Sequence, residues 1–355
     1  MNVGPAARRR VLVAPDSFGG SMSAGEAADA IAAGWREAAA ADTVTTLPLS
    51  DGGPGFVDVL DAGLRGTLVE LEVRDPLGRP ARGAVLVVDS SRRRTVYVES
   101  AQACGLHLLQ PFERDPSRTT SVGVAALLQA ALSAGADRIV VGLGGSGTND
   151  AGSAMIEGLG ADAERVRGVD LVVATDVDNP LLGPLGATAV FSAQKGATPD
   201  MMLVLEERLA RFADLIGPEL AQIPGAGAGG GLGFALFALG GHRESGADLV
   251  LRELNVVRLI AASDLVVTGE GSLDAQTLRG KLPVRVAARC LDAGVPCMAI
   301  AGRVMLGRRQ VAAAGFAGAY SIEDYAGSLE TAIALGAPGL HRLTAQVAAQ
   351  WHSSR

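Results

Sequence analysis

The alternation of apolar and polar positions divides the start of the chain into short strands and amphipathic helices. An apolar run at residues 10–15 predicts a buried strand, and the apolar spacing over residues 24–40 predicts a helix. A second strand is expected at residues 43–49 and a short helix at residues 57–64. Because parallel strands need a crossover connection, this order is typical of a parallel sheet covered by helices.

The pattern changes near residue 65. Residues 68–73 and 83–89 alternate like strands, and the turn-rich stretch 75–80 lies between them. Another strand is expected at residues 95–99. Hairpin-like strands after a parallel unit predict that a different domain begins near residue 65.

The rest of the chain alternates helices and strands. The last strands, at residues 265–268, 296–301 and 318–321, resemble the first unit resuming. We therefore expect an α/β fold in which one domain is inserted into another. The elements expected between the two parts of the first unit are helices at 120–134, 149–159 and 200–215, strands at 138–142 and 171–175, and a glycine tract at 226–233.

Composition narrows the class of protein. With 355 residues, 48% of them hydrophobic and only 4% aromatic, the chain predicts two domains with aliphatic cores. A formal net charge of −7 argues against a nucleic-acid partner, and no apolar run is long enough for a membrane span. Three sparse cysteines predict no disulfide framework and favour a cytoplasmic location. The sequence leaves open whether the protein forms a homo-oligomer.

Lysine is rare in this chain. Of 31 basic residues only Lys195 and Lys281 are lysines, and each lies beside a glycine. A lysine is a compact charge on a flexible stem, which suits contact with a phosphate oxygen. We interpret both as functional cations; the alternative is that they are remnants of a biased composition.

A glycine-rich segment, 142–150, lies between a predicted strand and a predicted helix. Glycines allow backbone amides to approach a phosphate closely, and a helix N-terminus adds partial positive charge. The alternative is a tight turn capped by polar side chains. The candidate phosphate-binding residues are Gly144, Gly145, Ser146, Thr148, Asn149 and Asp150.

Acidic residues follow several other predicted strands. Asp176 and Asp178 come after the strand at 171–175, where two carboxylates could share a cation; an Asx-turn is the alternative. Glu270 and Asp274 follow the strand at 265–268 and could act as acids or metal ligands, or cap a helix.

Asp16 with Ser17, and Asp51 with two glycines after it, follow the first two strands. Carboxyl ends of adjacent parallel strands line one crevice, so either aspartate could serve as a base or bind metal. No P-loop signature occurs, and the four histidines lie outside all these motifs. Glycines, carboxylates and lysines together suit phosphoryl transfer by positioning and charge stabilisation.

These motifs resemble those of the bacterial glycerate kinases along nearly the whole chain. The resemblance implies a discontinuous Rossmann-like domain, residues 1–64 and 245–355, interrupted by an inserted α/β domain, residues 65–244, with a cleft between them. The matching segments are 14–18, 51–53, 75–78, 144–150, 176–181, 194–199, 224–227, 268–271 and 280–281.

The resemblance further implies that ATP and Mg²⁺ are used to phosphorylate glycerate, commonly giving the 2-phosphate. Under this interpretation Asp51, Asp178 and Glu270 provide the base and bind magnesium without a firm assignment among them, with Asp176 as a further metal ligand. Lys195 and Lys281 stabilise phosphate charge. The substrate-binding candidates are Asp16, Ser17, Asp274 and Arg279.

The chain departs from the family pattern in four places. Gly19 stands where the family usually has lysine, and Pro54 stands where it usually has glutamate. Residues 99–104 replace an alanine-rich stretch, and the segment between Gly160 and Leu171 is shorter. We expect weak acceptor affinity unless an arginine replaces the missing cation, and the candidates for this are Arg279 and Arg303. Two alternatives stay open: a kinase for another small hydroxy acid, and a nucleotide-binding protein without catalysis.

Overall fold

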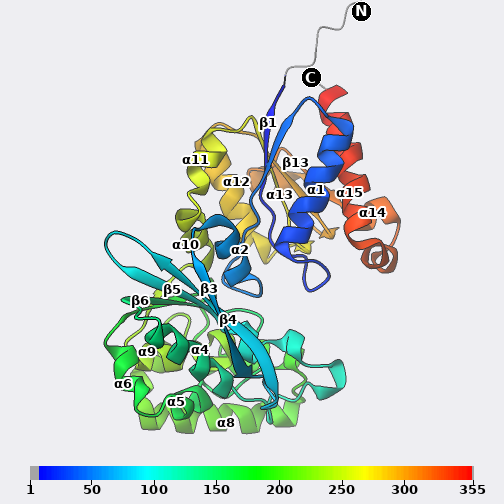
Figure 1. Cartoon of the computed structure of the whole chain (residues 1–355). Helices are drawn as coiled ribbons and strands as arrows, with labels where there is room; N and C mark the ends of the chain where they lie inside the picture. Colours follow the sequence, from blue (N-terminus) through cyan, green and yellow to red (C-terminus); the bar gives the residue numbers. More distant parts are fainter. Residues whose placement is uncertain (1–7, 354–355) are drawn as a thin grey trace, which may run out of the picture. The chain divides into compact units, whose positions relative to one another are not determined.

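The computed structural model describes residues 8–353, and these form two compact units (Figure 1). The first unit combines the residues up to Ser50 with those from Val250, and the second is Asp51–Leu249. Both contain helices and sheets, so the predicted α/β class is confirmed. No helix within residues 8–353 has both the length and the apolar character needed to cross a bilayer.

The units begin and end at other residues than the domain limits expected from sequence. Residues 51–64, expected in the first domain, cluster with the second unit. The reason is that helix α2 (Phe56–Gly63) packs against strands β4 (Pro80–Asp89) and β5 (Arg94–Glu99). Helix α10 (Gly246–Glu253) crosses the second limit.

The first unit is built on an all-parallel sheet with the strand order β13-β11-β9-β1-β2. Its central strands are short, apolar and buried on both faces, which is what parallel strands between helices require. Two further strands, β10 (Ser272–Leu273) and β12 (Arg303–Val304), form a separate small parallel sheet. The five strands are β1 (Arg10–Val13), β2 (Thr43–Thr46), β9 (Leu265–Thr268), β11 (Cys297–Ala301) and β13 (Gly318–Ser321).

The strand order reverses between β1 and β9. From β1 the chain moves to β2 on one side, whereas β9 leads to β11 and β13 on the other. In open parallel sheets ligands bind outside the carboxyl ends of the strands at such a switch point. The sheet therefore singles out the loops after β1 and β9 as the place to look for a site.

Helices cover this sheet. Helix α1 (Ala24–Ala38) begins with a capping box in which Ser23 and Glu26 satisfy each other's backbone amides. It packs against α15 (Leu329–Ser353), and Trp35 is buried in this contact. The remaining helices of this unit are α11 (Val256–Ala261), α12 (Leu282–Asp292), α13 (Arg308–Ala313), α14 (Ile322–Ala326) and the 3₁₀ helix η5 (Thr277–Arg279).

The second unit contains a six-stranded sheet with the order β3-β4-β5-β6-β7-β8. The first three strands pair antiparallel and the last four pair parallel. Alternate residues such as Val98, Ile139 and Leu171 face an aliphatic core, as the low aromatic content predicted. The strands not yet located are β3 (Thr67–Arg74), β6 (Arg138–Gly142), β7 (Asp170–Ala174) and β8 (His242–Glu244).

Helix α4 (Val122–Ser133) packs on β3, β4 and β5, and α9 (Ala228–Ala238) packs on β7. The glycine tract predicted from sequence lies at the start of α9, where the non-helical, left-handed backbone of Gly229, Gly230 and Gly231 makes a kink. The other helices are α3 (Ala101–Cys104), α5 (Ser153–Leu159), α6 (Asp162–Arg167), α7 (Ala187–Phe191), α8 (Pro199–Ile216), η1 (Leu106–Leu108), η2 (Pro111–Glu113), η3 (Ala193–Lys195) and η4 (Pro218–Gln222).

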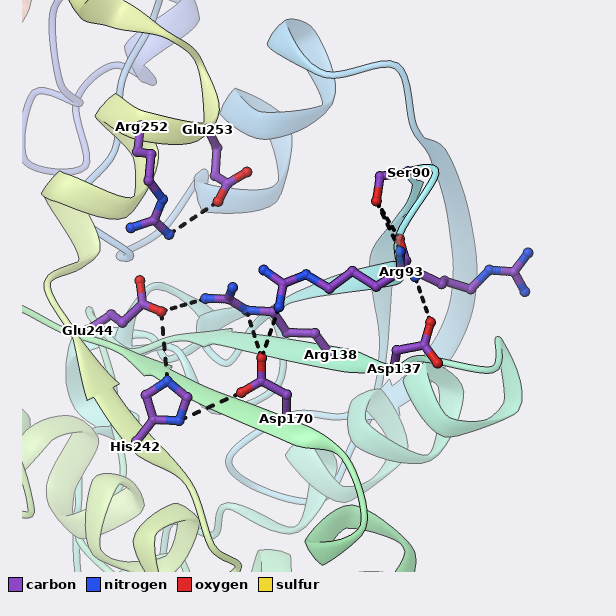
Figure 2. Close-up of polar contacts among 10 residues, drawn as sticks. Ser90, Arg93, Asp137, Arg138, Asp170, His242, Glu244, Arg252 and Glu253 are labelled. Atoms are coloured by element: carbon purple, nitrogen blue, oxygen red, sulfur yellow. Dashed lines mark hydrogen bonds and ion pairs between the residues drawn. The ribbon is translucent and has the colours of Figure 1, made fainter.

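A charged network joins the parallel strands of the second unit (Figure 2). Arg138 of β6 donates to Glu244 of β8 at 2.5 Å and lies 3.7 Å from Asp170 of β7. Arg93 also bonds Asp170, and His242 lies 3.7 Å from both acids. Because Arg138 is buried, these partners compensate its charge, and we interpret the network as structural.

Candidate functional site

The candidate residues of the first unit gather at the switch point of its sheet. The amide of Asp16, just after β1, donates to the carbonyl of Gly269 after β9 at 2.8 Å. The Thr268 hydroxyl donates to the Ala14 carbonyl at 2.8 Å. These bonds hold the Asp16–Ser17 loop beside the loop that carries Glu270.

Glu270 and Lys281 form the charged pair of this loop. The Glu270 carboxylate is buried and accepts a hydrogen bond of 2.5 Å from the Thr277 hydroxyl. The Lys281 ammonium lies 3.9 Å from its other oxygen. Lys281 is half-exposed, so the structure presents its ammonium at the surface with Glu270 behind it.

Asp274 and the two arginines have different surroundings. One carboxylate oxygen of Asp274 accepts the amides of Gln276 and Thr277, which forms the turn into η5. Arg279 ends η5 and is exposed. Arg303 donates from Nε to Glu323 at 2.8 Å. Of the two arginines expected to replace the missing lysine, Arg279 is therefore the more available.

The backbone at Gly19 accounts for part of the departure from the family. Gly19 has φ +56° and Gly20 has φ +85°, both in the left-handed region. A β-carbon at Gly19 would meet no neighbouring atom, but a lysine there would have to adopt a backbone that costs roughly 1–2 kcal/mol. This turn itself favours glycine.

In the second unit, the Asp51 loop lies against the glycine-rich loop after β6. The Asp51 carboxylate accepts the amide of Gly53 at 3.1 Å. A β-carbon on Gly144 would lie 2.6 Å from the Gly53 α-carbon, and one on Gly145 would lie 2.6 Å from a ring carbon of Pro54. The two loops thus approach so closely that Gly144 must be glycine, and Asp51 and Gly144 belong to one region.

The second half of the glycine-rich loop is turned inward. Ser146, Thr148, Asn149 and Asp150 are all buried. The Asp150 carboxylate accepts the amide of Ser121 at 2.9 Å and its hydroxyl at 2.8 Å, which caps the start of α4. The Asn149 side chain donates to Thr188. Only Gly144 and Gly145 retain exposed backbone within the predicted phosphate-binding segment.

The helix expected from residue 149 begins instead at Ser153. The preceding residues Ala151 and Gly152 have φ +55° and +72°, which no right-handed helix contains. The loop also needs room at its far side, because a β-carbon on Gly230 would lie 1.9 Å from the Thr148 carbonyl oxygen. The glycine tract therefore allows the start of α9 to lie directly against the glycine-rich loop.

Lys195 lies inside the unit rather than on its surface. It is 2% exposed, and its ammonium donates to the Thr148 carbonyl at 2.6 Å. Burial lowers the pKa of Lys195 to about 8. The sequence predicted a cation that contacts phosphate; the structure has this cation supporting the glycine-rich loop from within.

Asp176 and Asp178, predicted to share a metal ion, have separate partners. The Asp176 carboxylate accepts the Ser245 hydroxyl at 2.5 Å and the Ala247 amide at 3.1 Å. Asp178 is exposed and pairs with Arg243 at 2.5 Å. Among residues 8–353, no three or more histidine, cysteine, aspartate or glutamate side chains are arranged to hold a metal. A magnesium ion that arrives with nucleotide needs only one or two protein carboxylates beside the phosphates.

Glu99, which the sequence interpretation did not select, supports the Asp51 loop. It ends β5, is buried, and accepts the amides of Gly55 at 3.1 Å and Val57 at 3.2 Å. Burial raises the pKa of Glu99 to about 7, against the effect of these two hydrogen bonds. A charged residue closing an otherwise apolar strand was the available signal in the sequence.

We expect Glu99→Gln to remove a pH dependence of stability. Between pH 4.5 and 7 the unfolded chain loses the Glu99 proton while the folded chain keeps it, so wild-type stability falls as pH rises. Above pH 7 the loss of stability is complete. It amounts to about 3 kcal/mol, because the pKa rises from 4.5 to about 7 and each pKa unit corresponds to about 1.36 kcal/mol. Urea unfolding at pH 5 and pH 8 should show the wild type losing stability relative to Glu99→Gln. Glu157→Gln, on the exposed side of α5, is the control and should lose as much stability between pH 5 and pH 8 as the wild type. If Glu99→Gln also lost as much stability as the wild type over this range, the raised pKa of Glu99 would be contradicted.

The chain is similar to known glycerate kinases along nearly its whole length. A model of the glycerate kinase family matches residues 11–164 and 162–352. A glycerate kinase of Bacillus subtilis is 38% identical over 96% of this chain and 97% of its own length. A glycerate 2-kinase of Escherichia coli is 34% identical over 96% of this chain and 97% of its own.

The structural comparison agrees with the sequence comparison. A crystal structure from Salmonella typhimurium LT2, described as a candidate glycerate kinase 2, has a TM-score of 0.75 and 34% identity. It covers 98% of this chain and 99% of its own. The two segments matched by the family model meet at residues 162–164, within the stretch where this chain is short.

Proposed function

Because this chain belongs to the glycerate kinase family, we propose that it transfers the terminal phosphoryl group of ATP to glycerate. The observation that carries the proposal is the match to this family over nearly the whole chain, together with likeness to named glycerate kinases at 34–38% identity. The proposed product is 2-phosphoglycerate, since the Escherichia coli relative is named a glycerate 2-kinase.

In this proposal the exposed backbone of Gly144 and Gly145 receives phosphate oxygens of ATP. Lys195 acts as a positioning residue, because its bond to the Thr148 carbonyl supports the loop that carries both glycines. Asp178, at the carboxyl end of β7, is the exposed carboxylate that would meet the magnesium ion accompanying ATP. Magnesium, when bound, would neutralise charge on the phosphates.

Asp51 is the proposed base. Its carboxylate is half-exposed, is oriented by the Gly53 amide, and lies in the loop that contacts Gly144. It accepts the proton of the glycerate hydroxyl as that oxygen attacks phosphorus. Lys281 compensates the negative charge of the transferring group, and Glu270 holds the lysine in place.

The acceptor is proposed to bind at the switch point of the first unit. The Arg279 guanidinium pairs with the glycerate carboxylate, replacing the lysine that the family usually has at position 19. Asp16 and Ser17 offer hydrogen-bond partners for the hydroxyls, and Asp274 holds the loop that carries Arg279. A charge-assisted bond to carboxylate is among the stronger polar contacts, so Arg279 would largely set acceptor affinity.

The proposal is tested by measuring ADP release from Mg-ATP with glycerate and with a panel of other small hydroxy acids. We expect release to depend on glycerate, and phosphorus NMR to identify the 2-phosphate. Preference for another acid would identify the second enzyme alternative, which the unusual Gly19 and Pro54 favour. Nucleotide binding without turnover on any acid would contradict the proposal.

Two arginine variants provide a matched control for the acceptor site. Losing a charged partner of a bound carboxylate typically costs 1.5–3 kcal/mol, so Arg279→Ala should raise KM for glycerate roughly 10- to 100-fold. Arg303→Ala, which removes a guanidinium already paired with Glu323, should change KM much less. Equal effects of the two variants would mean that the acceptor carboxylate is held elsewhere.

A further inference from the structure

Helix α8 carries an exposed ridge with a leucine at each end and an ion pair in the middle. Leu203 is 74% exposed and Leu215 is 82% exposed. Between them Arg211 donates to Glu207 one turn earlier on the same helix, and these two side chains are 75% and 63% exposed. Residues four apart stack along one line on a helix, and such lines form the ridges by which helices pack. We call these four residues the α8 ridge.

The opposite side of α8 packs into the core of the second unit. Leu205, Leu209 and Ala213 are buried in the core of the second unit. The helix start is fixed by Thr198, whose hydroxyl accepts the Met201 amide, followed by a proline at the first helical position. Helix α8 lies at the edge of this unit (Figure 1). Neither folding nor capping explains the large apolar side chains Leu203 and Leu215 at the two ends of the outer ridge.

The α8 ridge is complementary to itself when one copy is reversed. Its order along the helix is leucine, acid, base, leucine. In an antiparallel pair whose twofold axis passes midway between Glu207 and Arg211 on the outer side of α8, Leu203 faces the partner's Leu215 and Glu207 faces the partner's Arg211. A twofold interface requires this kind of self-complementary surface, in which each contact occurs twice.

A groove beside the ridge gives the partner a place to pack. A hollow of about 410 Å³ runs along α8. Its lining includes members of the ridge and of the next line of residues, among them Val204, Arg208 and the half-buried Phe212. When the ridge of one helix packs into this groove on another, apolar side chains such as Leu215 are removed from contact with water.

We propose that two copies of this chain associate through an antiparallel pairing of their α8 helices. The apolar ends bury each other, and the two central pairs of opposite charge fix the register. Charge complementarity selects a second copy, because Glu207 and Arg211, which pair with each other within one helix, each also face their opposite on the partner and complete a four-charge cluster. The proposal does not depend on the proposed enzymatic function.

Charge reversal tests the pairing. We expect sedimentation of the wild type, from micromolar to millimolar concentration, to show a monomer–dimer equilibrium. E207R alone places arginine against arginine, and R211E alone places glutamate against glutamate, so each should weaken the dimer at least about tenfold. An equimolar mixture of the two variants should form a heterodimer, since every central contact then joins opposite charges. The double variant E207R/R211E should likewise recover self-association.

Matched measurements keep the test decisive. E164R, which reverses one charge of the exposed Glu164–Arg167 pair on α6, should leave association unchanged. At concentrations where the wild type is monomeric, melting curves of all variants should lie close to that of the wild type, because none of these side chains is buried within one chain. A wild type that stays monomeric would overturn the proposal, and so would a dimer that E207R and R211E do not weaken or a pair of variants that does not recombine.

Discussion

Replacing Asp51 by asparagine is expected to lower kcat for glycerate phosphorylation about 10²- to 10⁴-fold, the usual contribution of a positioned general base. Asparagine can still accept the Gly53 amide through its side-chain oxygen, so the loop keeps its 3.1 Å hydrogen bond while the base is lost. The measurement is steady-state kinetics with saturating Mg-ATP, together with a melting curve that should match the wild type.

Asp58→Asn is the control for this experiment. Asp58 is exposed on α2, the helix that follows the Asp51 loop, and its replacement removes the same charge from the same region. Its kcat should stay close to the wild type. If Asp51→Asn kept more than a tenth of the wild-type kcat, Asp51 would not be the base.

Lys281→Met is expected to lower kcat about 10²- to 10³-fold, because it removes one preorganised charge from the transferring group, an effect of roughly 3–4 kcal/mol. Methionine keeps much of the apolar stem, and Lys281 is half-exposed, so stability should change little. Parallel measurement of kcat and the melting temperature separates the two effects.

Lys195→Met provides the contrast. This side chain is buried and bonded to the Thr148 carbonyl, and leaving that acceptor unsatisfied costs roughly 1–3 kcal/mol. We therefore expect a lower melting temperature together with reduced turnover. Wild-type kinetics in Lys281→Met, or a loss of stability as large as that of Lys195→Met, would contradict the proposed role of Lys281.

Much of the fold could be predicted because its signals are local. The buried apolar runs at β6 and β9 predict these strands with their observed limits. The mixture of hairpin-like and crossover-connected strands predicts that two kinds of sheet pairing occur, and β3–β4 and β5–β6 confirm it. Apolar periodicity encodes which side of an element is buried, and turn residues encode where it ends.

Individual side chains of the candidate site were harder to predict, since their surroundings come from distant parts of the chain. Lys195 and Lys281 look alike in sequence, each beside a glycine. Lys195 lies in η3, which packs beneath the glycine-rich loop and buries it. Lys281 is the N-cap residue of α12 and stays half-exposed. Asp150 was similarly a candidate residue of the phosphate-binding segment, yet it accepts hydrogen bonds from Ser121, which lies 29 residues away in the chain.

The sequence by itself determined the α/β class, the order of the elements, and the carboxyl strand ends at which polar residues collect, because these depend on periodicity and on short glycine-rich and acidic motifs. The tertiary structure alone decided which of those polar groups are exposed. It placed Gly144 against Gly53, gave Glu99 the amides of α2, and turned four residues of the predicted phosphate loop inward. The physical reason is that burial and hydrogen bonding are set by contacts between segments far apart in the chain, and no local pattern of residues records them.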